Sequence, residues 1–455
     1  MDKRISSTYR YTLSAYQAVK EADLVIDGLT ILAGENGCGK STLSRWLYYL
    51  VNGVQRFDAY TMKAYVEKVE RLIRQHSMAA REIRYYIQSD NQSVNMPVTG
   101  GRSNPVRDYL GVAYGDDSVR QVQERFVQSV HALGDMIVEY LQKSKSGVRR
   151  DRIMKYLNME VVGDVSVDAA QTAEDFVDKN MRLLNQMTEK LNSDIEKRPL
   201  NRFLDNIRRE FEEKDSVPEQ IQLYEDGVEL VDRMRVATLF NLNRAIYIDT
   251  PMALTNESAE NVFWNELRRM VLQRRQELKL PEKKLLLRIK NILHGEAKMI
   301  ETDSPFAGEE LRFVSEDGKV NIEIEKAATG FKTFTYLQRL LENGFLGSDS
   351  LLLIDEPEAH LHPQWIVEYA RLLVLLHKDL GQKIMVATHN PDMVAALRAI
   401  AEREGVLDKT HFYIANIPEK QNGYIYKDLG HDISEIFTSF NIAISRIESY
   451  GTVSL

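Results

Sequence analysis

The sequence predicts an α/β fold into which a helical segment is inserted. Apolar, strand-like runs alternate with helical stretches in residues 1–55 and again in residues 221–455. Between them, residues 56–220 repeat apolar side chains every three to four positions, which is the period of an amphipathic helix. We therefore expect one α/β domain built from two lobes, with a helical bundle or short arm between the lobes.

The inserted segment carries three apolar stripes. They are Met62, Tyr65, Val69 and Leu72; Val122, Phe126, Val130, Leu133, Ile137 and Tyr140; and Phe176, Met181, Leu184, Met187 and Leu191. No stripe continues over many heptads, so a compact bundle is expected rather than a long coiled coil. Ordinary core packing is the best interpretation of these side chains.

The composition is that of a globular protein. Of 455 residues, 44% are hydrophobic and 28% are charged, which argues against extended disorder. A single cysteine excludes a disulfide framework within the chain and suits a reducing compartment. The polar N-terminus lacks a secretion signal, and no apolar run is long enough to cross a membrane. We expect a soluble, cytoplasmic protein, and its net charge of −8 argues against indiscriminate coating of nucleic acid.

A glycine-rich loop follows the first apolar run. Residues 22–33 are strand material, residues 34–41 read GENGCGKS, and residues 41–51 have the pattern of a buried helix. The loop satisfies G-x-x-x-x-G-K-[ST], in which glycines let backbone N–H groups curl around phosphate in front of a helix N-terminus. In this context the motif predicts a P-loop NTPase that binds ATP and Mg²⁺.

Each polar group of this loop has an expected role. The ammonium of Lys40 reaches the β- and γ-phosphate oxygens, and the Ser41 hydroxyl ligates Mg²⁺. The residues expected to contact the nucleotide are Glu35, Asn36, Gly37, Cys38, Gly39, Lys40, Ser41 and Thr42. A thiol at a helix N-terminus can be unusually acidic, so we expect alkylation of Cys38 to block ATP binding.

A second apolar strand ends in two acids. Leu351–Ile354 precede Asp355 and Glu356, the form that a Walker B strand takes. Asp355 is expected to hold Mg²⁺, and Glu356 is expected to orient and deprotonate the attacking water. His360 and His362 follow, but no cysteine or third histidine lies near them to complete a zinc site. We interpret that segment as a loop that contacts another subunit.

A third strand ends at a histidine. Residues 383–388 read KIMVAT and precede His389, and a helix begins after Pro391. A histidine at the end of a strand beside Walker B can contact the γ-phosphate. His389, Glu356 and Lys40 are therefore the expected catalytic residues.

Other elements of the C-terminal lobe can be placed from turn chemistry and apolar runs. We expect a hairpin at residues 221–231 with its turn at Asp226-Gly227, and a strand pair at 311–325 around Asp317-Gly318. A buried strand at 245–248 ends at Asp249, where the glutamine loop is expected to begin, and a helix covers about 258–293. The adenine contacts are not determined; Tyr9 and Tyr11 are candidates.

Together these motifs resemble the ABC-class ATPase heads of the SMC/RecF/OLD group, which have a mixed sheet. In such heads a signature segment of one subunit faces the γ-phosphate bound by another. The segment similar to it here reads AATGFK at residues 327–332 and departs from the common L-S-G-G-Q/E form. The resemblance implies nucleotide contacts by Thr329, Gly330 and Lys332, and a homodimer or higher oligomer joined through the heads.

Within this group, GENGCGKST, ATGFKT, LLIDEPEAHLHPQW and VATHNP are similar to the OLD-like ATPases of anti-phage systems. They look closest to the PtuA-type ATPases of Septu and retron-associated defence, as does the segment from residue 428 to 440. This resemblance implies regulation of a separate HNH nuclease of the PtuB type. Only 66 residues follow His389, too few for a Toprim nuclease domain, so no nuclease site is expected in this chain.

Other functions stay open. The chain could be a RecF- or SMC-like repair ATPase that acts directly on DNA, a defence ATPase with a toxin or reverse transcriptase partner, or a transporter's nucleotide-binding subunit. Two basic clusters bear on DNA: Lys143, Lys145, Arg149, Arg150 and Arg152; and Arg268, Arg269, Arg274 and Arg275. A solvated charged surface is the ordinary interpretation of both.

Overall fold

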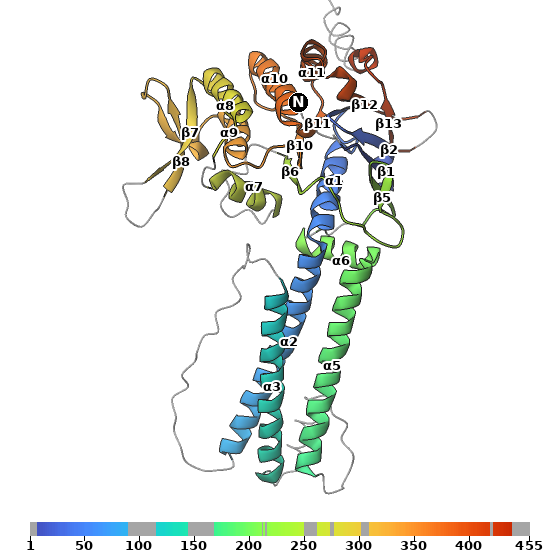
Figure 1. Ribbon diagram of the computed structural model, residues 1–455, viewed down its shortest axis with the longest axis vertical. Coiled ribbons are helices and arrows are strands. Elements are labelled where there is room, and N and C mark those ends of the chain that lie inside the picture. Colours follow the sequence, from blue (N-terminus) through green and yellow to red (C-terminus); the bar gives the residue numbers. More distant parts are fainter. Residues whose placement is uncertain are drawn as a thin grey trace, which may run out of the picture. The chain divides into compact units, whose positions relative to one another are not determined.

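The computed structural model describes residues 7–89, 115–143, 168–211, 213, 216–249, 262–273, 277–301, 309–418 and 422–438. The chain divides into two compact units, coloured along the sequence in Figure 1. Met1–Gln55 and Phe203–Leu455 form the first, which we call the sheet unit. Arg56–Arg202 form the second, which we call the helical unit.

Ten strands of the described residues form one mixed sheet in the sheet unit. In chain order they are β1 (Tyr9–Tyr16), β2 (Val19–Ile26), β3 (Leu29–Ala33), β4 (Gln220–Glu225), β5 (Val228–Val231), β6 (Arg244–Ile248), β10 (Ser350–Asp355), β11 (Lys383–Thr388), β12 (Thr410–Asn416) and β13 (Tyr424–Asp428). Their order across the sheet is β5-β4-β1-β2-β13-β12-β3-β11-β10-β6. The run β12-β3-β11-β10-β6 is parallel, whereas β1 pairs with β2 and β4 in antiparallel fashion. The expected P-loop α/β fold with a mixed sheet is confirmed.

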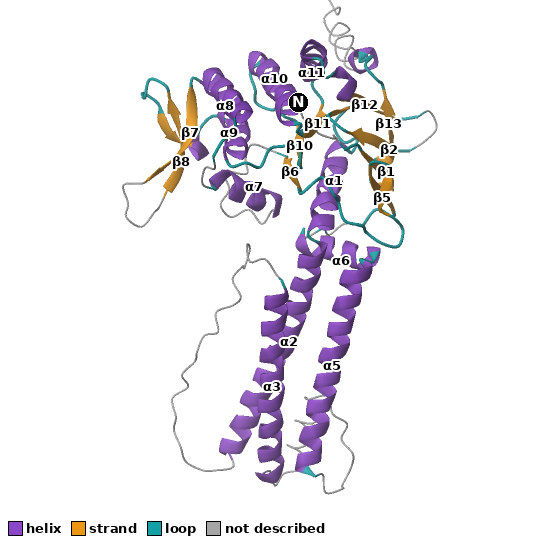
Figure 2. Ribbon diagram, in the orientation of Figure 1, coloured by secondary structure: helices purple, strands orange, loops and turns teal. Residues whose placement is uncertain are grey.

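A second, three-stranded sheet and several helices complete this unit (Figure 2). The small sheet contains β7 (Gly295–Glu301), β8 (Glu309–Ser315) and β9 (Asn321–Glu323). The helices are α1 (Lys40–Gln55), α6 (Leu200–Glu210), α7 (Val262–Leu272), α8 (Leu280–Leu293), α9 (Thr329–Glu342), α10 (Pro363–Leu380) and α11 (Pro391–Glu404). α6 begins in the helical unit and ends in the sheet unit. No helix among the described residues is long and apolar enough to span a bilayer.

The central strands are apolar because both faces of the sheet are covered. Every residue of β3, β10 and β11 is buried, the pattern of parallel strands between helical layers. α10 begins with His362 as its cap and Pro363 in its first turn, and it ends at Gly381 with a φ of 71°. Sequence preferences therefore agree with the observed ends of this helix.

The strand material at residues 22–33 forms two strands instead of one. The break falls at Asp27 and Gly28, between β2 and β3. A Cβ on Gly28 would lie 2.2 Å from the carbonyl oxygen of Lys409, so only glycine fits there. This contact joins residues nearly 400 positions apart, and the local pattern does not reveal it.

Turn predictions in the C-terminal lobe are confirmed. Asp226 and Gly227 have φ values of 49° and 83° and connect β4 to β5, as a type I′ hairpin requires. Gly318, with a φ of 67°, lies between β8 and β9. The helix expected over 258–293 is two helices, α7 and α8, and its first four residues lie outside the described part.

Residues 203–220 were expected in the helical insertion, but the described residues among them belong to the sheet unit. A Cβ on Gly53 of α1 would lie 2.9 Å from the Phe203 ring, which is fully buried. Tyr49 of α1 packs on Phe211 with ring centroids 4.7 Å apart. These aromatic contacts fix the end of α6 to α1.

The helical unit contains α2 (Phe57–Ser89), α3 (Asp116–Lys143) and α5 (Ala169–Lys197), which lie side by side in Figure 1. Its core includes residues from all three stripes, among them Val69, Phe126 and Phe176. Three amphipathic helices thereby bury one common apolar seam.

Candidate functional site

The phosphate loop leaves a buried strand and leads into a helix. It follows β3 at Gly34, and α1 begins at Lys40. Gly37 and Gly39 have φ values of 83° and 94°, the left-handed region in which a side chain would be strained. A Cβ on Gly39 would also lie 2.6 Å from a methyl carbon of Val19. Glycine is therefore required at position 39 on two grounds.

The ammonium of Lys40 lies inside this loop. It donates hydrogen bonds of 2.9 Å to the carbonyl oxygens of Gly34 and Glu35. Glu35, Asn36 and Ser41 are exposed around it, whereas only 6% of Lys40 is exposed. A buried cation held by two carbonyl oxygens is well placed to exchange them for phosphate oxygens.

Cys38 faces away from the exposed side of the loop. It is fully buried, and its Sγ lies 3.6 Å from the Tyr426 hydroxyl and 3.8 Å from the Lys40 ammonium. The Tyr426 hydroxyl also donates to the Cys38 carbonyl oxygen over 3.2 Å. The thiol has no exposed surface in this conformation, and the block of ATP binding by its alkylation stays a prediction. Any contact of Cys38 with nucleotide would come from its backbone.

The side chain of Thr42 is also engaged within the protein. Its hydroxyl donates to the Gln17 side chain over 3.0 Å, at the turn between β1 and β2. Gln17 has a φ of 49°, so the bond supports a turn in the left-handed region. Thr42 therefore fixes the β1–β2 turn beside the loop.

Asp355 ends β10 and is held by hydroxyl groups. Ser44 donates to one carboxylate oxygen and Tyr247 to the other, each over 2.7 Å. Burial raises the pKa of Asp355, and hydrogen bonds from Ser44, Ser41 and Tyr247 oppose the rise. A carboxylate and the Ser41 hydroxyl thus meet beside the loop, and oxygen donors of this kind are what Mg²⁺ prefers.

Ser44 and Tyr247 were not identified from the sequence. Ser44 lies one helical turn after Lys40, and Tyr247 lies in β6, which pairs with β10. The available signal was a hydroxyl inside an otherwise apolar strand. Whether the Tyr247 hydroxyl points toward Asp355 depends on the pairing of Tyr247 with Leu353, and no local sequence pattern gives this pairing.

The strand order places three motifs at one edge of the sheet. β11 lies between β3 and β10, and the three strands are parallel. Their carboxyl ends therefore carry the phosphate loop, His389 and Asp355 next to one another. Nδ1 of His389 lies 3.2 Å from a carboxylate oxygen of Glu356. These two side chains are 42% and 44% exposed, so a ligand at this edge can reach both.

Glu358 is a further carboxylate at this edge, and no role for it is predicted from the sequence. Its side chain is 4% exposed. One of its oxygens accepts hydrogen bonds from the Thr388 hydroxyl at 2.6 Å and from the backbone N–H of His389 at 3.2 Å. An acid directly after Glu356-Pro357 was the signal that could have drawn attention to it.

Asp249 lies near this acidic edge, where the glutamine loop was expected to begin. It follows β6 and accepts a hydrogen bond of 2.7 Å from the Trp264 indole. Burial raises the pKa of Asp249, and the Asp355 carboxylate adds to the rise. The two adenine candidates do not reach the surface, because Tyr9 and Tyr11 are 1% and 0% exposed in β1.

The signature-like segment forms the start of α9. Ala328 is exposed and Thr329 is half-buried, whereas the Lys332 ammonium is turned inward and donates to the Glu325 carbonyl oxygen over 2.8 Å. Gly330 is buried, and a Cβ there would lie 2.9 Å from the Trp365 ring. Lys332 would have to turn outward to contact a neighbouring subunit, and Gly330 is required for packing.

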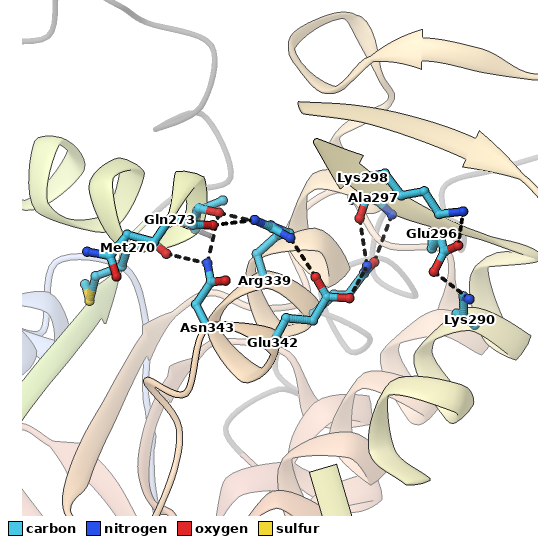
Figure 3. A network of polar contacts seen from close by, with 11 residues as sticks. Met270, Gln273, Lys290, Glu296, Ala297, Lys298, Arg339, Glu342 and Asn343 are labelled. Atoms are coloured by element: carbon cyan, nitrogen blue, oxygen red, sulfur yellow. Dashed lines mark hydrogen bonds and ion pairs between the residues drawn. The ribbon is translucent and has the colours of Figure 1, made fainter. Parts of the chain in front are cut away.

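A buried polar network fixes the other end of α9 (Figure 3). Arg339 and Glu342 are 4% and 6% exposed and form an ion pair of 2.7 Å. Arg339 also donates to the carbonyl oxygen of Gln273, just beyond α7, over 2.8 Å. Gln338 exchanges two hydrogen bonds with the backbone of Ala297 in β7. α9 is thereby bound to α7 and to the small sheet, with the buried charges satisfied.

His362 and the described arginines of the second basic cluster make contacts within the protein. Several other residues of the basic clusters lie outside the described residues. His362 caps α10 through its ring nitrogen, which accepts from the Gln364 N–H at 3.4 Å. Arg268 and Arg269 pair with Glu325 and Glu266. The members of the basic clusters and of the C-terminal segment that lie outside the described residues are Lys145, Arg149, Arg150, Arg152, Arg274, Arg275, Ser439 and Phe440. The described arginines therefore give no support to a DNA-binding helix.

Comparison with solved structures finds SMC heads. A head bound to the C-winged helix domain of ScpA aligns with a TM-score of 0.37 and 11% identity, covering 94% of this chain and 98% of that chain. A Pyrococcus furiosus Smc head with an extended coiled coil, bound to the C-terminal domain of ScpA, aligns with a TM-score of 0.33 and 10% identity, covering 95% and 98%.

Comparison with known sequences finds a defence protein and an ATPase family. Septu protein PtuA of Bacillus thuringiensis is 32% identical over 118 residues, which cover 23% of this chain and 29% of that protein. The match thus spans less than a third of that relative's length. The AAA_15 model, an AAA ATPase domain, matches residues 151–394, which include Asp355 and His389. ATP hydrolysis is the activity that this family implies. Since the model matches more than half of the sequence, the chain belongs to the AAA_15 family of AAA ATPase domains.

Proposed function

We propose that two copies of this chain share ATP sites between their sheet units, and that the nucleotide-linked dimer regulates a partner nuclease in bacterial anti-phage defence. The observation that carries the proposal is that the adjacent parallel strands β3, β11 and β10 end in the phosphate loop with Lys40, in His389 and in Glu356, the last two 3.2 Å apart. Membership of the AAA ATPase family supports hydrolysis. The partial match to Septu protein PtuA supports the defence setting.

Each residue at the edge has one task in this mechanism. Lys40 binds the β- and γ-phosphate oxygens, and the loop glycines let backbone N–H groups approach them. Ser41 and Asp355 would hold Mg²⁺, which would neutralise part of the phosphate charge. Glu356 orients the attacking water and accepts its proton, and His389 donates to a γ-phosphate oxygen. Ser44 and Tyr247 keep the Asp355 carboxylate in place.

The neighbouring copy closes the site with the start of its α9. An exposed helix N-terminus carries partial positive charge and unpaired N–H groups, which suit a γ-phosphate. Ala328, Thr329 and Phe331 are the residues of the segment that reach the surface, and Ala328 and Thr329 lie at the helix N-terminus, so the phosphate contact falls to these two. Hydrolysis removes the phosphate that joins the two copies, and the interface then opens.

The partner in this proposal is a separate HNH nuclease of the PtuB type, which the partial match to Septu protein PtuA supports. Purification of the tagged protein from its native host should bring down a nuclease in stoichiometric amount. Recovery of the ATPase with a DNA-repair complex and no such nuclease would instead favour the repair function.

The shared site is tested with Glu356→Gln. This variant keeps the shape of the side chain but cannot accept the proton of water, so turnover should stop while Mg-ATP remains bound. We expect sedimentation velocity to show dimers in saturating Mg-ATP and monomers without nucleotide. The double variant Lys40→Ala, Glu356→Gln is the control and should stay monomeric. Monomers of Glu356→Gln in saturating Mg-ATP would contradict the proposal.

A further inference from the structure

Glu358 is a buried carboxylate with incomplete hydrogen bonding. Its Oε1 accepts from the Thr388 hydroxyl and the His389 N–H, but its Oε2 has no hydrogen-bond partner in the described part of the chain. Burial raises the pKa of this carboxyl, and the hydrogen bond from Thr388 opposes the rise. A buried oxygen without a partner costs folding free energy, which a residue used only for packing would avoid.

The loop that contains Glu358 has two residues in the left-handed region. Glu356 and His360 have φ values of 47° and 66°, and they lie on either side of Glu358. Non-glycine residues keep such conformations only where the surroundings hold them. Two bonds do so here, since the N–H of Glu356 donates to the Ala387 carbonyl oxygen over 2.7 Å and Glu358 binds Thr388. Both bonds join the loop to the end of β11.

The imidazole of His389 is placed differently from its backbone. The backbone N–H of His389 donates to the Glu358 carboxylate, whereas the ring nitrogen Nδ1 makes no hydrogen bond among the described residues. Nδ1 lies 3.2 Å from Glu356 and 3.6 Å from Glu358. Turning the ring toward a ligand therefore separates Nδ1 from these two carboxylates but breaks no hydrogen bond among the described residues, while the His389 backbone stays attached to the loop.

From this geometry we infer that Glu358 is a positioning residue for ATP hydrolysis. It fastens Thr388 and His389 to the loop of residues 356–362, so that the histidine and the loop change conformation together. This inference rests on the proposed function, in which Glu356 and His389 take part in ATP hydrolysis. No hydrogen bond among the described residues joins Glu358 to the phosphate loop, so nucleotide affinity does not depend on it.

Three variants test this role through the separation of kcat from ATP affinity. Glu358→Ala removes both accepted bonds and should lower kcat about ten- to a hundredfold, the cost of misplacing a catalytic group. The Kd of a fluorescent ATP analogue should change by less than about twofold, because the phosphate loop binds the analogue. Glu358→Gln keeps an oxygen that accepts the same two bonds and should restore kcat to within about threefold of the wild type.

Thr388→Val provides an independent arm, because it removes the hydrogen bond to Glu358 and preserves the shape of the side chain. It also removes the hydrogen bond that the Thr388 hydroxyl accepts from the Asn390 N–H over 3.0 Å. It should lower kcat and leave the Kd unchanged. If Glu358→Ala does not fold, Thr388→Val still tests the positioning role. An unchanged kcat in Thr388→Val or Glu358→Ala would overturn the inference. So would a Kd that weakens as much as kcat falls, or a Glu358→Gln variant as defective as Glu358→Ala.

The inference and the proposed function can fail separately. Dimerisation of Glu356→Gln reports on the shared site, whereas the Glu358 and Thr388 variants are read in steady-state turnover. If Glu356→Gln stays monomeric while Glu358→Ala still loses kcat alone, the shared site is wrong and the positioning role stands. If Glu356→Gln forms dimers and Glu358→Ala leaves kcat unchanged, the shared site stands and the positioning role of Glu358 is wrong.

Discussion

The two units of this protein differ in what they bury. The sheet unit encloses charged groups, among them Asp355, Glu358 and the Arg339–Glu342 pair. In the described part of the helical unit, the buried polar side chains are Thr61, His76 and Thr172, within a core of aliphatic and aromatic residues. Burying charge is costly unless partners compensate for it. The chemistry is therefore concentrated in the sheet unit, and the helical unit is held by ordinary packing.

This difference gives opposite expectations for substitutions. Removal of a polar group at the open edge of the sheet should change turnover more than stability. Removal of an apolar group from the helical unit should change stability and leave the nucleotide site intact.

The largest effect is expected from Phe126→Ala in the helical unit. Phe126 is fully buried in α3, and its ring lies 5.2 Å from the ring of His76. Truncation of a buried phenylalanine costs about 3–5 kcal/mol of unfolding free energy. Urea unfolding followed by circular dichroism should show this loss, while Glu124→Ala, an exposed neighbour, should show none. A matching loss of ATP affinity in the folded Phe126→Ala protein would remove the separation between the units.

Lys40→Ala should act in the opposite way. It removes the cation held inside the phosphate loop, so ATP turnover should fall at least about a hundredfold, the cost of losing one preorganised charge. The free energy of unfolding should change little, because the hydrogen bonds of the ammonium to described residues go to two carbonyl oxygens and to Sγ of Cys38, within its own loop. Lys284→Ala, an exposed lysine of α8, is the matched control in steady-state assays. Turnover close to wild type in Lys40→Ala would show that the loop is not the site.

The smallest expected effect is a pH dependence of the free energy of unfolding that comes from His76 in the helical unit. Burial lowers the pKa of His76, so the unfolded chain binds a proton more readily than the folded one. The associated stability is present above the ordinary histidine pKa and is lost as the pH falls below it. Urea unfolding of the wild type at about pH 7.5 and 5.5 should show this loss on either side of that value. His76→Leu should weaken the dependence; an equal dependence in both proteins would contradict it.

The sequence allowed the motif-bearing parts to be predicted because their signals are local. The phosphate loop is contiguous, and the buried parallel strands β10 and β11 are unbroken apolar runs that end in functional groups. Each motif follows the carboxyl end of its strand, so the motifs can be expected at the same edge of a parallel sheet.

The remaining features depend on contacts between distant segments. Tyr247 binds Asp355 through the register of β6 on β10, and Glu358 binds Thr388 across thirty residues. The direction of the Cys38 thiol is set by Tyr426 in β13, and the break at Gly28 is set by Lys409. Periodicity and motif spacing carry no information on such pairs.

The shared ATP site is tested most directly by mixing two inactive variants. Lys40→Ala lacks a working phosphate loop but keeps the start of α9. Thr329→Glu keeps its loop, and glutamate is favourable at a helix N-terminus, but the charge should repel a neighbour's γ-phosphate. In mixed dimers one site combines Lys40 of one copy with Thr329 of the other. Random pairing in an equal mixture should then restore about a quarter of wild-type turnover, as expected for a symmetric dimer. Turnover no higher than the mean of the two separate variants would contradict the shared site.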